Sequence, residues 1–95
     1  MKEENIGLAM VIAKSAGMSG KVRTSTSALA AATGFSQQSI SRKLREMEAE
    51  GLISRRASNS GIEVAFAEKG RKELESFYLE LKEIFSGRQR QKPVL

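Results

Sequence analysis

The segment from Ser36 to Arg45 places four polar side chains where they can act together on one face of a helix. The four are Gln38, Ser41, Arg42 and Arg45. An α-helix turns by about 100° per residue, so positions three, four and seven apart share a face. The opposite face carries the apolar residues Ile40, Leu44 and Met47. We therefore expect an amphipathic helix whose apolar side faces a core and whose polar side faces outward.

These side-chain types suit the edges of base pairs in the major groove of DNA. Glutamine can form paired hydrogen bonds with adenine and arginine with guanine, while the small Ser41 lets the helix approach closely. Ser36 and Gln37 at the start of this helix, and Ser25 and Thr26 at the start of the preceding one, can offer donors to phosphate. Taken alone, the polar face fits the solvent-exposed side of an ordinary amphipathic helix equally well.

The charges of the 95-residue chain are unevenly distributed, with a formal net charge of +5. From Asn5 to Arg45 there is no acidic residue but there are six basic ones. Three glutamates then follow at the end of the predicted helix, namely Glu46, Glu48 and Glu50. This asymmetry favours a surface that binds a polyanion, with acid only where the helix would leave the groove.

The composition argues against an enzyme. The chain has no Cys and no His, which removes disulfides, thiolate or imidazole metal sites and His-dependent triads. Neither a paired-carboxylate pattern nor a phosphate-binding loop is present, so we expect no catalytic residue, no metal and no cofactor. No apolar run approaches the roughly 20 residues that span a bilayer. We expect a cytoplasmic protein without a membrane partner.

Capping residues and glycines divide the chain into short elements. We expect helices over 3–16, 26–33, 37–50 and 68–86, and a short strand over 22–24. Ser25 and Ser36 are the predicted N-caps of the second and third helices. Gly34 and Gly51 are the predicted left-handed stops after them. Phe35 is predicted to be a buried plug in the turn between these two helices.

Residues 52–57 and 62–66 alternate in polarity and are predicted to be two strands joined by a turn over 58–61. The segment 55–62 is then a wing that contacts the sugar-phosphate backbone or the minor groove. Its predicted DNA contacts are Arg55, Arg56, Ser58 and Asn59. Neighbouring strand residues face opposite ways, so at most one of the two arginines points at DNA. The alternative is an ordinary hairpin edge protected by its charges.

The first and last helices carry more apolar surface than a small domain needs. One stripe of the first helix consists of Ile6, Met10, Ala13 and Gly17. The apolar residues Leu8, Val11 and Ile12 fall outside this stripe, so the helix is apolar nearly all round. We expect this helix in the core, the alternative being that an extra face meets another copy or domain. The last helix predicts a partner surface, for a homodimer or an appended domain. Residues 88–95 are predicted to be a basic tail or truncated linker, which leaves 1–87 as the domain.

Two helices joined by Gly34-Phe35-Ser36 and followed by a hairpin predict a winged helix-turn-helix. The fold is mostly α-helical with a small β-hairpin, in the order helix, strand, two helices, two strands, helix. We predict a transcription regulator domain that binds double-stranded DNA sequence-specifically, with 37–50 as its recognition helix. The alternative is a protein-interaction or dimerisation module that uses the first and last helices and binds no specific DNA.

The chain resembles the winged-helix transcription regulators of the MarR-like class. The matching residues are Leu44-x-x-Met47-Glu48-x-x-Gly51-Leu52-Ile53-x-Arg55, then Ile62-x-Val64 and Glu68-Lys69-Gly70. Residues 36–44 and 78–85 more narrowly resemble the N-terminal domain of archaeal bifunctional proteins that join such a domain to a CTP-dependent riboflavin kinase.

In that archaeal family the winged domain regulates riboflavin-related genes, and the kinase domain follows the last helix. The resemblance implies that the recognition helix reads DNA through Gln37, Gln38, Ser41, Arg42 and Arg45. The 95-residue sequence contains no kinase portion, so none of the nucleotide, metal or flavin residues of the kinase carries over.

Overall fold

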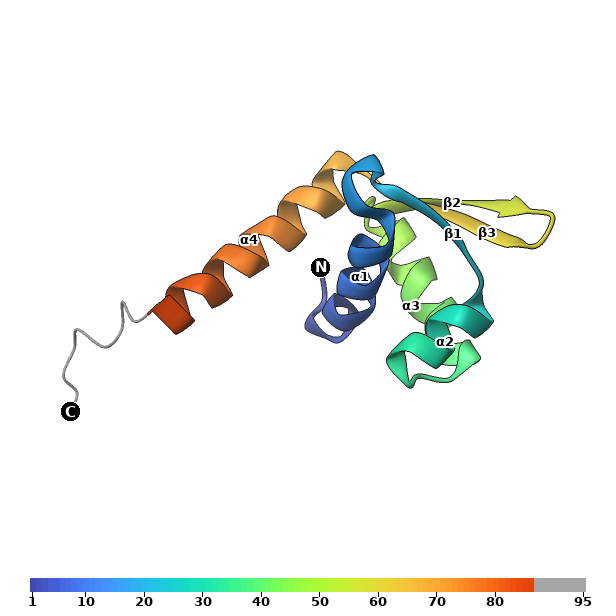
Figure 1. The fold of residues 1–95 in the computed structure, drawn as a ribbon, viewed down its shortest axis with the longest axis horizontal. Helices are drawn as coiled ribbons and strands as arrows, with labels where there is room; N and C mark the ends of the chain where they lie inside the picture. Colours follow the sequence, from blue (N-terminus) through green and yellow to red (C-terminus); the bar gives the residue numbers. More distant parts are fainter. Residues whose placement is uncertain (87–95) are drawn as a thin grey trace.

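The computed structural model describes residues 1–86, which form four α-helices and one three-stranded sheet (Figure 1). The elements are α1 (Glu3–Ala16), the 3-10 turn η1 (Gly17–Ser19), β1 (Lys21–Thr24), α2 (Thr26–Thr33), α3 (Gln37–Ala49), β2 (Ile53–Ser58), β3 (Gly61–Phe66) and α4 (Glu68–Ser86). The predicted winged helix-turn-helix is confirmed, with element ends within a residue of those expected. The predicted tail over 88–95 lies outside the described residues.

The sheet is antiparallel, with β3 between the edge strands β1 and β2. In the β2–β3 hairpin Ser58 pairs with Gly61, so the turn of the wing consists only of Asn59 and Ser60. Val64 in the middle of β3 is fully buried, and its neighbours across the sheet are Val22 and Arg55. This inner face of the sheet therefore covers one side of the helical core.

The core is aliphatic and centres on α3. Its fully buried large side chains include Leu8 and Ile12 of α1, together with Ile40, Leu44 and Met47 of α3. Leu52, at the junction between α3 and β2, is also fully buried. The wing and α4 extend from this core in opposite directions (Figure 1). Within residues 1–86, no helix has both the length and the apolar character needed to cross a bilayer.

The face of α1 that enters the core differs from the predicted stripe. The buried residues are Asn5, Leu8, Ala9 and Ile12, while Met10 is 42% exposed. These four positions share a face at the spacing of one helical stripe. Asn5 fits there because its Nδ2 group donates a hydrogen bond to Glu46 Oε1 at 3.2 Å. The prediction of a core helix is confirmed. The predicted stripe through Ile6, Met10 and Ala13 was wrong, because the buried face contains the polar residue Asn5 and so does not show as an uninterrupted apolar stripe in the sequence.

The helix-turn-helix forms from local capping interactions. Ser25 Oγ accepts a hydrogen bond from Ala28 N–H at 3.0 Å, and Ser36 Oγ accepts one from Ser39 N–H at 3.1 Å. Gly34 has φ of 83°, the left-handed conformation that ends α2.

Phe35 is 37% exposed, so the prediction of a buried plug was wrong. The turn lies at the surface, and the Lys43 ammonium stands 4.7 Å from the centre of the Phe35 ring. The ring is therefore covered by a charged side chain from α3.

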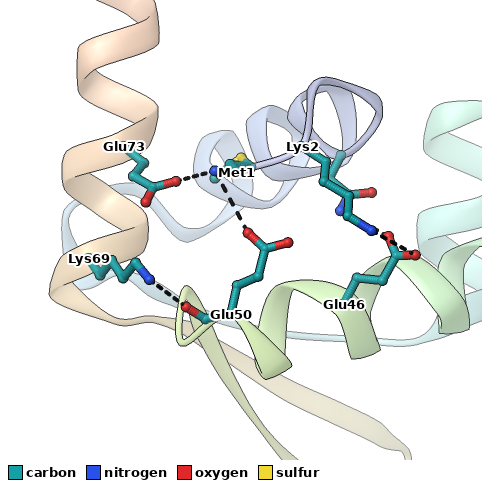
Figure 2. Close-up of polar contacts among 7 residues, drawn as sticks. Met1, Lys2, Glu46, Glu50, Lys69 and Glu73 are labelled. Atoms are coloured by element: carbon teal, nitrogen blue, oxygen red, sulfur yellow. Dashed lines mark hydrogen bonds and ion pairs between the residues drawn. The ribbon is translucent and has the colours of Figure 1, made fainter.

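The start of α4 is fixed against the junction between α3 and β2. Ala67 N–H donates a hydrogen bond to Leu52 O at 2.9 Å, and Lys69 Nζ donates one to Glu50 O at 2.9 Å (Figure 2). Gly70 is buried, and a Cβ atom at that position would lie 2.1 Å from Leu52 O. The Glu68-Lys69-Gly70 sequence thus lets the two backbones pack together.

Polar contacts also connect α1, α3 and α4 (Figure 2). The Met1 amino group donates a hydrogen bond to the Glu73 carboxylate of α4 and lies 3.8 Å from Glu50 Oε1. Lys2 Nζ lies 3.5 Å from Glu46 Oε2 of α3. Two glutamates near the end of α3 are therefore directed towards the N-terminal segment.

The backbone contact at Gly70 leads to a stability prediction. We expect Gly70→Ala to lower the free energy of unfolding by about 3 kcal/mol, the upper end of the usual cost of overpacking, because a carbonyl of the core junction blocks the new methyl group. Gly51→Ala is the control: it has φ of 77° but open space around it, so we expect a loss of about 1 kcal/mol. Urea unfolding of both variants measures this difference. Equal losses would contradict the tight packing.

Glu46 gives a prediction on pH. The hydrogen bond from Asn5, together with the charges of Lys2 and Arg42, lowers the pKa of Glu46 below its ordinary value of 4.5. A carboxyl group whose pKa is lower in the folded than in the unfolded protein stabilises the fold at pH values above its unfolded pKa. This stabilisation is lost as the pH falls through the folded pKa. We expect the free energy of unfolding of Glu46→Gln to fall less steeply below about pH 5 than that of the wild type. Urea unfolding at several pH values tests this, and parallel pH curves for wild type and variant would contradict it.

Candidate nucleic-acid interface

The polar face of α3 forms one side of a shallow surface hollow of about 660 Å³. Its lining residues are Thr26, Ser36, Gln37, Gln38, Ser39, Ser41, Arg42 and Arg45. Every α3 residue predicted to contact DNA lies here, together with the N-cap residue Ser36 and Thr26 from α2. The structure adds Ser39, which the sequence pattern did not predict. The helix-turn-helix therefore gathers these side chains on one surface.

The two arginines of this surface are available to a ligand. Arg42 and Arg45 are exposed, and neither forms an ion pair with another described residue. The opposite face of α3 is fully buried through Ile40, Leu44 and Met47. The helix thus presents two unpaired guanidinium groups beside amide and hydroxyl groups.

Glu46 and Glu48 of α3 and its C-cap residue Glu50 have partners within the protein. Glu46 contacts Asn5 and Lys2, Glu48 accepts hydrogen bonds from Arg55, and Glu50 lies near the Met1 amino group. Each carboxylate is therefore offset by a donor or cation from α1, β2 or the N-terminal residue. This arrangement leaves the Arg42–Arg45 side of the helix positive.

The N-terminal ends of α2 and α3 lie next to each other. Thr26 Oγ1 donates a hydrogen bond to Gln37 Oε1 at 3.3 Å, which joins the first residues of the two helices. Ser25 and Ser36 use their Oγ atoms as N-caps. Ser25 does not line the hollow. Two helix N-termini on one surface offer partial positive charge to a phosphate group.

The two wing arginines have different surroundings. Arg55 donates two hydrogen bonds to Glu48 Oε1, from Nε at 3.1 Å and from Nη2 at 2.9 Å, so it ties β2 to the end of α3. Arg56 is 78% exposed and forms an ion pair with Glu63 at 3.0 Å. The register places Arg55 beside buried Val64 and Arg56 beside Glu63, on opposite faces of the sheet. Arg56 is the wing arginine that reaches outward.

A second hollow of about 320 Å³ lies beside the wing. Its lining residues are Arg23, Arg56, Ala57, Ser58, Asn59, Ser60 and Glu63. Arg56, Ser58 and Asn59 were predicted DNA contacts, whereas Arg23, Ser60 and Glu63 were not. Arg23 belongs to β1, and only the pairing of β1 with β3 brings it next to the wing. The sequence shows its charge but not this pairing.

Comparison with known proteins identifies the architecture. The family model described as "MarR family" matches residues 6–61. This chain belongs to the MarR family. The matched segment runs from α1 to the first residue of β3. It includes the helix-turn-helix, all lining residues of the first hollow and those of the second hollow except Glu63.

Three similar proteins illustrate the relationship. The riboflavin kinase of Pyrococcus furiosus is 35% identical over 81 residues, which are 85% of this chain but only 38% of that protein. MepR, a transcription regulator of the Staphylococcus aureus multidrug efflux pump MepA, superposes with a TM-score of 0.78 at 17% identity, covering 99% of this chain and 67% of that one. The M. tuberculosis regulator MosR, solved in complex with DNA, gives 0.74 at 21% identity, covering 94% and 65%. The two structural matches show a shared fold.

One basic residue of α3 in this MarR-family domain faces inward. Lys43 is 5% exposed; its Nζ donates a hydrogen bond to Glu4 O at 2.7 Å and stands over the Phe35 ring. Lys43 is one of the six basic residues in the acid-free segment from Asn5 to Arg45, but its charge does not reach the surface. It instead joins α3, the start of α1 and the helix-turn-helix turn. Among residues 1–86, no three His, Cys, Asp or Glu side chains cluster as metal ligands would.

The burial of Lys43 leads to a labelling prediction. We expect an amine-reactive acetylating reagent to modify Lys43 at least about tenfold more slowly than exposed Lys14 and Lys21, because reaction requires local opening of the turn. Peptide mass spectrometry over a time course measures the three rates. The denatured chain is the control, in which the three rates should converge. Equal rates in the folded protein would show that Lys43 is a surface residue.

Proposed function

We propose that this domain binds double-stranded DNA sequence-specifically as a transcription regulator. The observation that carries the proposal is the distribution of charge on α3. Arg42 and Arg45 are exposed and form no ion pair with another described residue, while the three glutamates at the C-terminal end of the helix, counting its C-cap, are engaged with neighbouring elements. A helix with this polarity can enter the major groove with its N-terminal part first.

Each part of the interface has a chemical role in this proposal. Arg42 and Arg45 would donate paired hydrogen bonds to guanine, and Gln38 would pair with adenine, while Ser41 lets the helix approach. The helix N-termini, through Ser25, Thr26, Ser36 and Gln37, would hold backbone phosphates. The wing would contact the backbone or minor groove through Arg56, Ser58 and Asn59. Arg55 would act indirectly by holding β2 against α3.

The comparisons support this proposal and suggest a target. MepR is described as a transcription regulator, and MosR was solved with DNA. The curated relatives are riboflavin kinases, of which this chain spans 38% in the Pyrococcus furiosus protein. We propose that residues 1–87 are the DNA-binding part of such a protein, that 88–95 are a basic tail or a linker to a following domain, and that riboflavin-related genes are its target. Such a regulator would act in the cytoplasm, and a kinase domain would supply any enzymatic activity.

The exposed side of α4 favours a second role in protein interaction. Tyr78, Leu79, Leu81 and Phe85 are 42–78% exposed on the part of α4 that extends away from the core (Figure 1). An apolar surface of this kind marks an interaction site. We propose that α4, with α1, contacts a second copy or an appended kinase domain. A domain that used only this surface would be an interaction module without specific DNA binding.

Fluorescence anisotropy of the 95-residue chain tests DNA binding directly. The duplexes are a riboflavin-gene promoter and a shuffled control, titrated at several salt concentrations. We expect Arg42→Ala or Arg45→Ala to weaken promoter binding by about 5- to 150-fold and to reduce the preference over the shuffled duplex. Lys82→Ala, a charge removed from α4, is the control and should leave both affinities unchanged.

Salt dependence separates the two roles. Contact with about five phosphates predicts a slope near −4.5 in a plot of log affinity against log salt, whereas apolar docking barely responds to salt. Unchanged preference in both arginine variants would refute the role of α3. Absence of binding at low salt would leave the interaction module as the function.

A further inference from the structure

Three charged side chains form a row across the outer face of the sheet. Arg23 of β1 and Arg56 of β2 both pair in register with Glu63 of the central strand β3. Residues opposite each other in an antiparallel sheet point to the same side, with Cβ atoms about 5 Å apart. Across the three strands, the row therefore consists of a cation, a carboxylate and a second cation, in that order.

The row forms the floor of the hollow beside the wing, together with Ser58 at the end of β2 and Asn59 and Ser60 of the turn. The backbones of β1 and β3 are in close contact at this end, since a Cβ atom on Gly61 would lie 2.2 Å from Thr24 O. This contact places Arg23 at the base of the wing, although the whole helix-turn-helix lies between Arg23 and Arg56 in the sequence.

The charges of the row are not balanced. Glu63 Oε1 accepts a hydrogen bond from Arg56 Nη2 at 3.0 Å. Arg23 is exposed and forms no ion pair with another described residue. The hollow therefore offers the unpaired guanidinium group of Arg23, a second one held by a carboxylate, and the hydroxyl and amide groups of the turn. A guanidinium group can donate two parallel hydrogen bonds to two oxygens of a phosphate, so this set of donors suits a phosphodiester.

We propose that this hollow binds a backbone phosphate of the DNA duplex, with Arg23 as its main ligand. Glu63 acts as an internal competitor: it holds Arg56 in the free protein, and the phosphate replaces it in the complex. The inference rests on the proposed DNA binding and extends the contact surface from α3 around the wing to β1. It adds a phosphate contact that carries no base preference.

A charged residue on an edge strand can also serve only to prevent strand pairing. Lys21 provides the comparison, because it lies on the same strand and the same face as Arg23. It pairs with Ala65, further from the wing, and does not line the hollow. A purely protective role makes the two positions equivalent for DNA binding, whereas the phosphate site does not.

The test measures anisotropy of the full chain with promoter and shuffled duplexes across a salt series. We expect Arg23→Gln to weaken binding to both duplexes by a similar factor of about 5 to 10, and to reduce the magnitude of the salt slope by about 1. Lys21→Gln should change affinity by less than about twofold. Glu63→Gln should strengthen binding by about threefold or more, because it removes a negative charge next to the phosphate. Circular dichroism confirms that each variant is folded.

The outcomes separate this inference from the proposed function. If Arg42→Ala loses base preference while Arg23→Gln matches Lys21→Gln in affinity and salt slope, the phosphate site is wrong and the DNA-binding function stands. Weaker binding by Glu63→Gln would refute the competitor role. Wild-type protein that binds neither duplex would overturn the proposed function itself, and with it this inference.

Discussion

The structure depends on α3 being a core helix and a surface helix at once. Ile40, Leu44 and Met47 are fully buried on one side. Each such side chain contributes about 1.5–3 kcal/mol when it is removed from water, so the core fixes the rotation of the helix about its axis. With the rotation fixed, helical geometry directs Gln38, Ser41, Arg42 and Arg45 outward without further contacts. The apolar face therefore supplies the packing, while Arg42 and Arg45 on the polar face form no ion pair with another described residue.

Two glutamates of α3 and the glutamate at its C-cap complete this arrangement at the C-terminal end of the helix. Each is directed to a different neighbour: Glu46 to α1, Glu48 to β2 and Glu50 to the N-terminal residue. The contact between Glu48 and Arg55 also sets the position of the wing relative to the helix. α3 and the wing are thus linked through a pair of opposite charges, and Arg55 is held by Glu48 and does not reach outward as Arg56 does.

Local signals in the sequence predicted the elements well because the interactions that form them are local. The caps Ser25 and Ser36 and the left-handed Gly34 act within a few residues, and the α3 face follows from helical spacing alone. The errors at Phe35 and on the face of α1 have a different origin. Periodicity shows which residues share a face, but a neighbouring element decides which face is buried. The surroundings of Lys43, Arg23 and Glu63 were not predicted for the same reason, since contacts distant in sequence determine them.

The arrangement of α4 follows from one small residue. Only Gly70 of this helix is buried, and beyond Tyr78 every described residue is exposed. A helix gains most of its stability in a protein from packing of its apolar side. On the outer half of α4, Tyr78, Leu79, Leu81 and Phe85 are 42–78% exposed within residues 1–86, so packing against a second surface would stabilise this half of the helix. Because α4 extends away from the wing (Figure 1), such a surface can cover it while the polar face of α3 and the wing remain exposed.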